Sequence, residues 1–216
     1  MPPDSASEAA QRSAVIPVKT FARAKTRLQA PPSVRADLAR ALLLDVLAAC
    51  RESCLIGEVV VVSAETMLSD LLDNKIKLIL QDDDRGVNQA ITSAIKQAGL
   101  CGPVAVMVAD IPCASGEQLD AILNRAGDQE RWFVPDADSI GTVMLGSRNP
   151  AGLRPSMGRR SRATHADTGA IELVDDRWQR LRRDVDTLAH LRAAVVSGAG
   201  TQTSAFARAL GLVDPS

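Results

Sequence analysis

Glu58-Val59-Val60-Val61-Val62 contains four consecutive valines, and this run is the best guide to the fold class. An unbroken β-branched run is expected for a strand that is buried on both faces. Strands of this kind are typical of parallel sheets that are covered by helices on either side. The run therefore predicts a central strand of an α/β protein.

The segments on either side of this strand alternate between short apolar runs and amphipathic runs. A first strand is expected at residues 14–18, and a helix capped by Ser33 is expected to run to about Cys50. Further strands are expected at residues 76–80, 104–109, 133–135 and 142–147, and further helices at residues 65–73, 87–98, 116–126 and from about Thr187. This order predicts a mostly parallel sheet with helices on both faces, in which ligands bind beyond the carboxyl ends of the strands.

The bulk composition excludes several classes of function. Apolar residues make up 46% of the 216 residues, enough for a sizeable core, and the net charge of −1 gives no general attraction to nucleic acid or to an anionic membrane. Aromatic residues make up only 2%, which argues against a surface that stacks single-stranded bases. No apolar run approaches the ~18 residues of a membrane-spanning helix.

The chain is expected to hold one domain. Residues 1–12 are mostly Pro, Ser, Ala and charged residues, so they are interpreted as a flexible tail and not as a secretory signal. Residues 13–216 are expected to form a single domain, in which the stretch 148–160, rich in Gly, Pro and Arg, is a long functional loop. The four cysteines lack C-x-x-C spacing, so they are interpreted as reduced thiols of a cytoplasmic protein.

A basic loop directly follows the first strand. Its four cations are Lys19, Arg23, Lys25 and Arg27. A triphosphate requires such a site, because its charge must be neutralised and its oxygens held by Lys and Arg. A solvated basic loop is the alternative, but the position after the strand favours phosphate binding. The sequence contains neither a G-x-x-x-x-G-K nor a G-x-G-x-x-G motif, so P-loop hydrolysis and dinucleotide binding are poorly supported.

Three carboxylates lie where strands are expected to end. Asp110 follows an apolar strand and precedes Ile-Pro, which suits a magnesium ligand, although a capping role at the turn is the alternative. Asp184 and Asp186 are two residues apart, hence on one side of an extended segment. Asp186 alternatively caps the following helix, and Arg182 or Arg183 alternatively neutralises the pair. Together, the three carboxylates predict a site for one or two magnesium ions.

Three other polar features are weaker candidates. The acidic run at residues 82–84 is interpreted as a solvated loop, whereas Asn88 lies at a helix start where it can contact a base or sugar. His165 lies in an Arg-rich segment and is a candidate for contact with an anion. His190 falls in the last helical region and is interpreted as structural.

These motifs, in this order, resemble a known family. The chain resembles the guanylyltransferases of deazaflavin coenzyme F-420 biosynthesis from residue 15 to about residue 193. The motifs that carry the resemblance are Ile16-Pro17-Val18-Lys19, Ala24-Lys25-Thr26-Arg27-Leu28, Gly86-Val87-Asn88, Ala109-Asp110-Ile111-Pro112, Ser161 to His165, and Arg183-Asp184-Val185-Asp186-Thr187. The first two and the last are rather specific, whereas Asp-Ile-Pro alone is not.

The resemblance implies a three-layer, Rossmann-like nucleotidyltransferase fold of the nucleotide-diphospho-sugar transferase type. It implies that Lys19, Lys25 and Arg27 bind the triphosphate and that Asn88 also binds the nucleotide. It implies that magnesium is bound by Asp110, Asp184 and Asp186. The acceptor is expected to bind at Thr142, Gly158 and Ser161, near His165. The choice of guanine comes only from the resemblance. The chain departs from the family pattern around Thr142 and Ser161, where Ser139-Ile140-Gly141-Thr142 replaces Gly-Thr-Gly-Thr and Met157-Gly158-Arg159-Arg160 replaces Phe-Gly-Pro.

The expected reaction moves GMP from GTP to the phosphate of 2-phospho-L-lactate, phosphoenolpyruvate or 3-phospho-D-glycerate, with release of pyrophosphate. The attacking phosphate oxygen is already anionic, so positioning and charge neutralisation suffice without a general base. Two alternatives stay open: a transferase of the same fold with another base and acceptor, and a non-catalytic nucleotide-binding protein. The sequence also leaves open whether the chain forms a homodimer and whether its product passes directly to a following enzyme.

Overall fold

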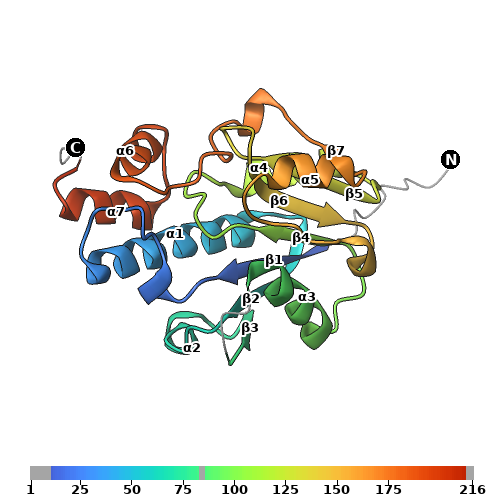
Figure 1. Cartoon of the computed structure of the whole chain (residues 1–216), viewed down its shortest axis with the longest axis horizontal. Helices are drawn as coiled ribbons and strands as arrows, with labels where there is room; N and C mark the ends of the chain where they lie inside the picture. The colour runs from blue at the N-terminus through green and yellow to red at the C-terminus, as the bar shows by residue number, and fades with distance from the viewer. Residues whose placement is uncertain (1–10, 83–85, 213–216) are drawn as a thin grey trace, which may run out of the picture.

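The computed structural model describes residues 11–82 and 86–212, so most of the expected tail lies outside the described residues. Its centre is a seven-stranded sheet in the order β3-β2-β1-β4-β6-β5-β7 (Figure 1). The strands are β1 (Arg12–Val18), β2 (Ile56–Ser63), β3 (Ile76–Leu80), β4 (Val104–Met107), β5 (Arg131–Pro135), β6 (Thr142–Ser147) and β7 (Ile171–Glu172). Only the β4–β6 and β5–β6 pairs are antiparallel among the strand pairs of the described residues. The mostly parallel α/β sheet is confirmed.

The valine run of β2 is buried on both faces of the sheet, as predicted. Val59 and Val61 pack into the core on the α1 side, whereas Val60 and Val62 pack into the core on the α3 side. All four are at most 8% exposed. Burial of one valine side chain stabilises the fold by up to about 1.5–3 kcal/mol. Successive side chains of a strand point to opposite faces, and both faces are buried here. Every position of the run is therefore apolar.

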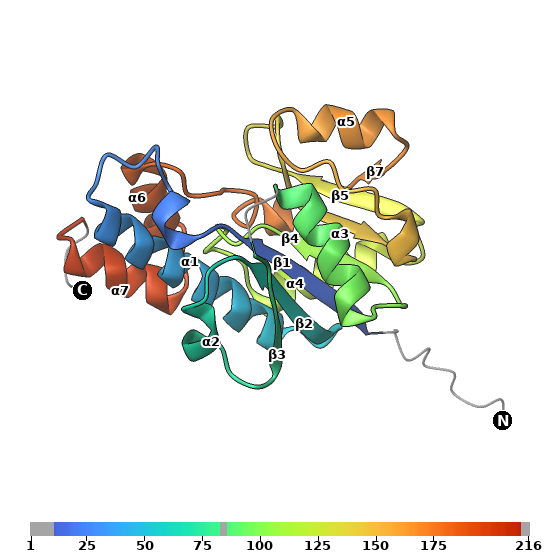
Figure 2. The same ribbon diagram turned by 60° about the horizontal axis from the view of Figure 1, so that its bottom comes forward.

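Helices cover both faces of the sheet. They are α1 (Pro32–Glu52), α2 (Leu68–Leu71), α3 (Val87–Ala98), α4 (Gly116–Ala126), α5 (Ser161–Asp167), α6 (Leu188–Val196) and α7 (Thr201–Ala209), with short 3-10 turns η1 (Phe21–Arg23), η2 (Pro150–Gly152) and η3 (Asp176–Trp178). Helices α1 and α4 pack on one face of the sheet and α3 on the other (Figure 1). Helices α6 and α7 pack against α1 through a third apolar cluster, beside the sheet (Figure 2).

Three expectations about local structure were wrong. Ser33 does not cap α1: the helix begins at Pro32, after Pro31, because proline needs no hydrogen-bond partner for its nitrogen in the first turn. The helix expected at residues 65–73 is only the short α2, which begins after a local turn in which the Glu65 side chain accepts from the Met67 N–H at 3.4 Å. The strand expected at residues 104–109 ends at Met107.

The region after β6 holds elements that were not predicted, namely η2, α5, β7 and η3. They are short, so their sequences carry little periodicity. Helix α7 was likewise not separated from α6. All four cysteines are free, as expected. Within the described ranges, no helix combines the length and the apolar character that crossing a membrane requires.

Candidate functional site

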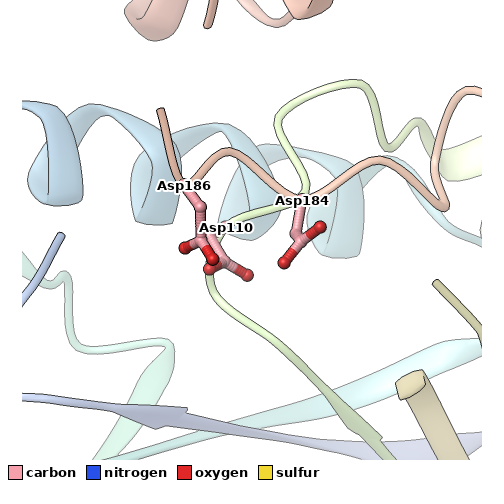
Figure 3. A group of neighbouring side chains, drawn as sticks. All are labelled: Asp110, Asp184 and Asp186. Carbon is pink, nitrogen blue, oxygen red and sulfur yellow. The ribbon is translucent and has the colours of Figure 1, made fainter. Parts of the chain in front are cut away.

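Asp110, Asp184 and Asp186 meet at the carboxyl end of β4 (Figure 3). One carboxylate oxygen from each lies within 4.8 Å of the others. The contact depends on the backbone, because the Val185 N–H donates to the Asp110 carbonyl at 3.0 Å. Val185 is fully buried, so the aspartates on either side of it turn toward Asp110. The structure thus brings together the three carboxylates that the sequence singled out.

Two cations of the basic loop contact this cluster. The Lys25 Nζ lies 2.5 Å from Asp110 Oδ2 and 3.5 Å from Asp186 Oδ1. Arg27 Nη1 lies 2.9 Å from Asp186 Oδ2. Burial alone would lower the pKa of Lys25, whose side chain is only 8% exposed, but the charges of the three aspartates together raise it. The loop and the carboxylates therefore form one charged site.

The carboxylate charge is only partly neutralised. Burial, followed by the charges of Asp110 and Asp186, raises the pKa of Asp184 to about 6. Asp184 makes no salt bridge with any residue in the described part of the chain. An all-oxygen donor set with excess negative charge fits a hard divalent cation such as magnesium or manganese.

Lys19, the third cation predicted to bind the triphosphate, lies at the exposed edge of the site. Lys19 follows β1 directly, is exposed, and makes no ion pair with a described residue. The loop that carries Lys25 is held by Glu65, whose Oε2 accepts from the Phe21 N–H at 2.9 Å. Lys25 itself adopts a left-handed conformation with a φ of 52°. Sequence reasoning missed Glu65, which has only a local turn signal.

Thr142, Ser161 and His165 converge in a second, buried cluster. The Thr142 Oγ1 lies 3.0 Å from His165 Nδ1 and 3.1 Å from Ser161 Oγ. The Ser156 N–H donates to His165 Nε2 at 3.2 Å. His165 is fully buried, and burial, with a smaller contribution from Arg131, lowers its pKa to about 4.

Sheet register places this second cluster beside the carboxylates. Thr142 opens β6, and the carbonyl of the next residue, Val143, accepts from the Val108 N–H at 3.0 Å, just before Asp110. Gly158 lies on the loop that leads to Ser161 and has a φ of +134°, a conformation that favours glycine. The residues predicted to hold the acceptor thus lie on one side of the carboxylate cluster.

Asn88 connects helix α3 to the loop at residues 148–160. Its Nδ2 donates to the Met157 carbonyl at 3.1 Å, and its Oδ1 accepts from the Met157 N–H at 2.6 Å. Both polar groups of the side chain therefore contact protein backbone. Its assignment to the nucleotide stays a prediction. Residues 148–160 contain the short turn η2 but neither an α-helix nor a strand, in line with their interpretation as a loop.

Arg182 performs a role that sequence reasoning missed. It was weighed as a charge partner for Asp184 and Asp186, but its guanidinium donates to the carbonyls of Pro135 at 2.9 Å and Asp136 at 2.7 Å. It therefore ties the segment before Asp184 to the end of β5 and to the loop that follows it. His190 supports the same segment, because its Nδ1 accepts from the Asp186 N–H at 3.4 Å.

Known proteins are similar to this chain in sequence or in fold. The family model described as "Guanylyl transferase CofC like" matches residues 12–216. The phosphoenolpyruvate guanylyltransferase of Streptosporangium roseum is 34% identical over 205 residues, covering 93% of this chain and 92% of that protein. A solved Desulfovibrio desulfuricans protein, assigned to the nucleotide-diphospho-sugar transferases, has a TM-score of 0.69 at 18% identity, covering 94% and 96% of the two chains. A Mycobacterium tuberculosis protein solved as a manganese complex has a TM-score of 0.57 at 16% identity, covering 87% and 99%. The likeness to these two structures confirms the predicted fold type.

Proposed function

The chain belongs to the CofC-like guanylyl transferase family, and from that premise we propose that it transfers GMP from GTP to a small phosphorylated acid in coenzyme F-420 biosynthesis. The acceptors to consider are 2-phospho-L-lactate, phosphoenolpyruvate and 3-phospho-D-glycerate. The name of the Streptosporangium roseum relative favours phosphoenolpyruvate. We also propose that residues 13–216 act as one cytoplasmic domain.

The observation that carries this proposal is the joint presence of Asp110, Asp184 and Asp186 with Lys25 and Arg27 at the carboxyl end of the sheet. A magnesium ion held by the three carboxylates would offset the charge of the triphosphate during transfer. The manganese complex of the Mycobacterium tuberculosis structure supports a divalent ion in this fold. Lys25 and Arg27, with Lys19 at the rim, would hold triphosphate oxygens.

The reaction needs no general base. An anionic phosphate oxygen of the acceptor attacks the α-phosphorus of GTP, a new O–P bond forms, and the bond to the β-phosphate oxygen breaks. Pyrophosphate leaves with the electron pair of that bond. The chain then has two tasks, to align the two phosphates and to stabilise the charge on the leaving group. Thr142, Gly158 and Ser161 would hold the acid on the β6 side of the carboxylates, with His165 behind them.

The decisive experiment measures pyrophosphate release with magnesium and GTP, offering the three acids one at a time and identifying the product by mass. Release with one acid would establish both the reaction and its acceptor. Replacement of GTP by ATP, CTP or UTP tests the alternative of another base. GTP binding without pyrophosphate release with any of the three acids would contradict the proposal and favour a non-catalytic nucleotide-binding protein.

A further inference from the structure

The buried cluster of Thr142, Ser161 and His165 permits its hydrogen atoms to be counted. His165 is fully buried, Ser161 is 1% exposed and Thr142 is 7% exposed. The contacts inside the cluster are His165 Nδ1 to Thr142 Oγ1 at 3.0 Å and Ser161 Oγ to Thr142 Oγ1 at 3.1 Å. Neither hydroxyl makes another hydrogen bond to a described residue.

The neighbouring backbone fixes which nitrogen of His165 carries the proton. The Ser156 N–H points at Nε2 from 3.2 Å, and a backbone amide can only donate. Nε2 is therefore the acceptor, and the proton of the neutral imidazole is on Nδ1. The Nδ1–H then donates to the Thr142 hydroxyl oxygen.

With this tautomer, one hydrogen of the cluster has no acceptor inside it. The cluster holds three hydrogens, one each on Nδ1, the Thr142 hydroxyl and the Ser161 hydroxyl, but only two internal contacts to use them. With the opposite tautomer, Nδ1 would accept from Thr142 and both hydroxyl hydrogens would be used inside the cluster. The observed arrangement instead requires one hydroxyl to direct its O–H out of the cluster.

We propose that His165 is a positioning residue that obliges the Thr142–Ser161 hydroxyl pair to donate one hydrogen bond to an anionic oxygen of the phosphorylated acid. The inference rests on the proposed function for the identity of the acid. The location supports it, because Thr142 opens β6 beside the chain that leads to Asp110. A hydrogen bond to a charged oxygen is stronger than one to a neutral oxygen. A hydroxyl whose O–H has no acceptor inside the cluster therefore favours an anionic ligand over a neutral one.

The tautomer is tested first, without any substrate. The nitrogen chemical shifts of protein labelled with ¹⁵N-histidine distinguish Nδ1–H from Nε2–H, and a His190→Gln variant assigns the signals, since the chain has two histidines. We expect Nδ1 of His165 to be protonated and Nε2 to be unprotonated at pH 7. An Nε2–H tautomer would overturn the inference, whether or not the protein transfers GMP.

The second test separates acceptor binding from nucleotide binding. Thr142→Val keeps the shape of the side chain but removes the hydroxyl, and Thr142→Ser restores it. We expect Thr142→Val to raise the KM for the acid about 10- to 100-fold while the KM for GTP stays unchanged, and Thr142→Ser to recover most of the loss. Equal changes in both KM values, or none, would overturn the inference.

Variants of His165 test the source of the effect. His165→Asn places an amide donor near the position of Nδ1, whereas His165→Leu removes it, and circular dichroism shows whether each variant folds. If folded His165→Leu keeps the wild-type KM for the acid, His165 has no positioning role. If wild-type protein uses none of the three acids, the proposed function fails, and the tautomer measurement still stands on its own.

Discussion

Replacing Asp110 by asparagine tests the carboxylate cluster with almost no change of shape. Asp110 attracts Lys25, whose Nζ lies 2.5 Å from its Oδ2, and repels Asp184 and Asp186, whose oxygens lie within 4.8 Å. At an effective dielectric constant of about 20, the attraction is about 7 kcal/mol and each repulsion is at least about 3.5 kcal/mol. The two repulsions together are therefore large enough to offset the attraction. We therefore expect Asp110→Asn to change the free energy of unfolding by no more than about 2 kcal/mol.

Turnover should respond very differently. If Asp110 holds magnesium, its loss removes charge stabilisation in the transition state and should lower turnover by about two to three orders of magnitude. The assay is pyrophosphate release at saturating GTP, magnesium and acid, with urea denaturation in EDTA to measure stability. Asp37→Asn, an exposed carboxylate on α1, is the matched control and should be neutral in both assays. Near-normal turnover of Asp110→Asn would refute the metal assignment. Destabilisation well beyond 2 kcal/mol would instead show that the repulsions do not offset the attraction to Lys25.

Three further predictions concern the basic loop, the core and the pH response. Lys25→Met keeps the length of the side chain but not its charge, so the KM for GTP should rise about 10- to 100-fold, and an unchanged KM would remove Lys25 from the triphosphate site. Gly146→Ala should destabilise the fold by about 1–3 kcal/mol in urea denaturation, because its Cβ would overlap the buried Trp132 indole; an unchanged midpoint would contradict the packing. Burial lowers the pKa of His165 from 6.5 to about 4, so the unfolded chain binds more protons between these values. The stability present above pH 6.5 should fall by up to about 3 kcal/mol as the pH drops to about 4. His190→Gln should keep this loss and His165→Asn should reduce it; equal pH dependence in both variants would refute the assignment.

Local patterns were enough to predict the framework of the site. Residues 87–98 and 116–126 were predicted as helices within the bounds that the structure gives to α3 and α4. The valine run of β2 predicted a central strand because side chains alternate between two buried faces. These features depend on residues close together in the sequence, so their period and burial are visible without a tertiary structure. The carboxyl-end rule for parallel strands then directed attention to Asp110.

The same local reasoning failed where contacts join distant segments. Arg182 stands near two acidic residues in the sequence, yet it donates to carbonyls at the end of β5, more than forty residues away. Asn88 stays a prediction as a nucleotide contact, but its pairing with the backbone of Met157, 69 residues away, was not visible in the sequence. Sequence proximity carries no information about such partners.

The amino-acid sequence alone established an α/β nucleotidyltransferase of a recognisable family and the identity of its three clustered aspartates, since strand periodicity and short motifs are local properties. Tertiary structure was required to show that Val185 bonds to Asp110, that Lys25 reaches the carboxylates, and that Ser156 determines the tautomer of His165. The physical reason is that charge interactions and hydrogen bonds depend on distances of a few ångströms. Only the packing of the sheet and its loops sets those distances between residues far apart in the chain.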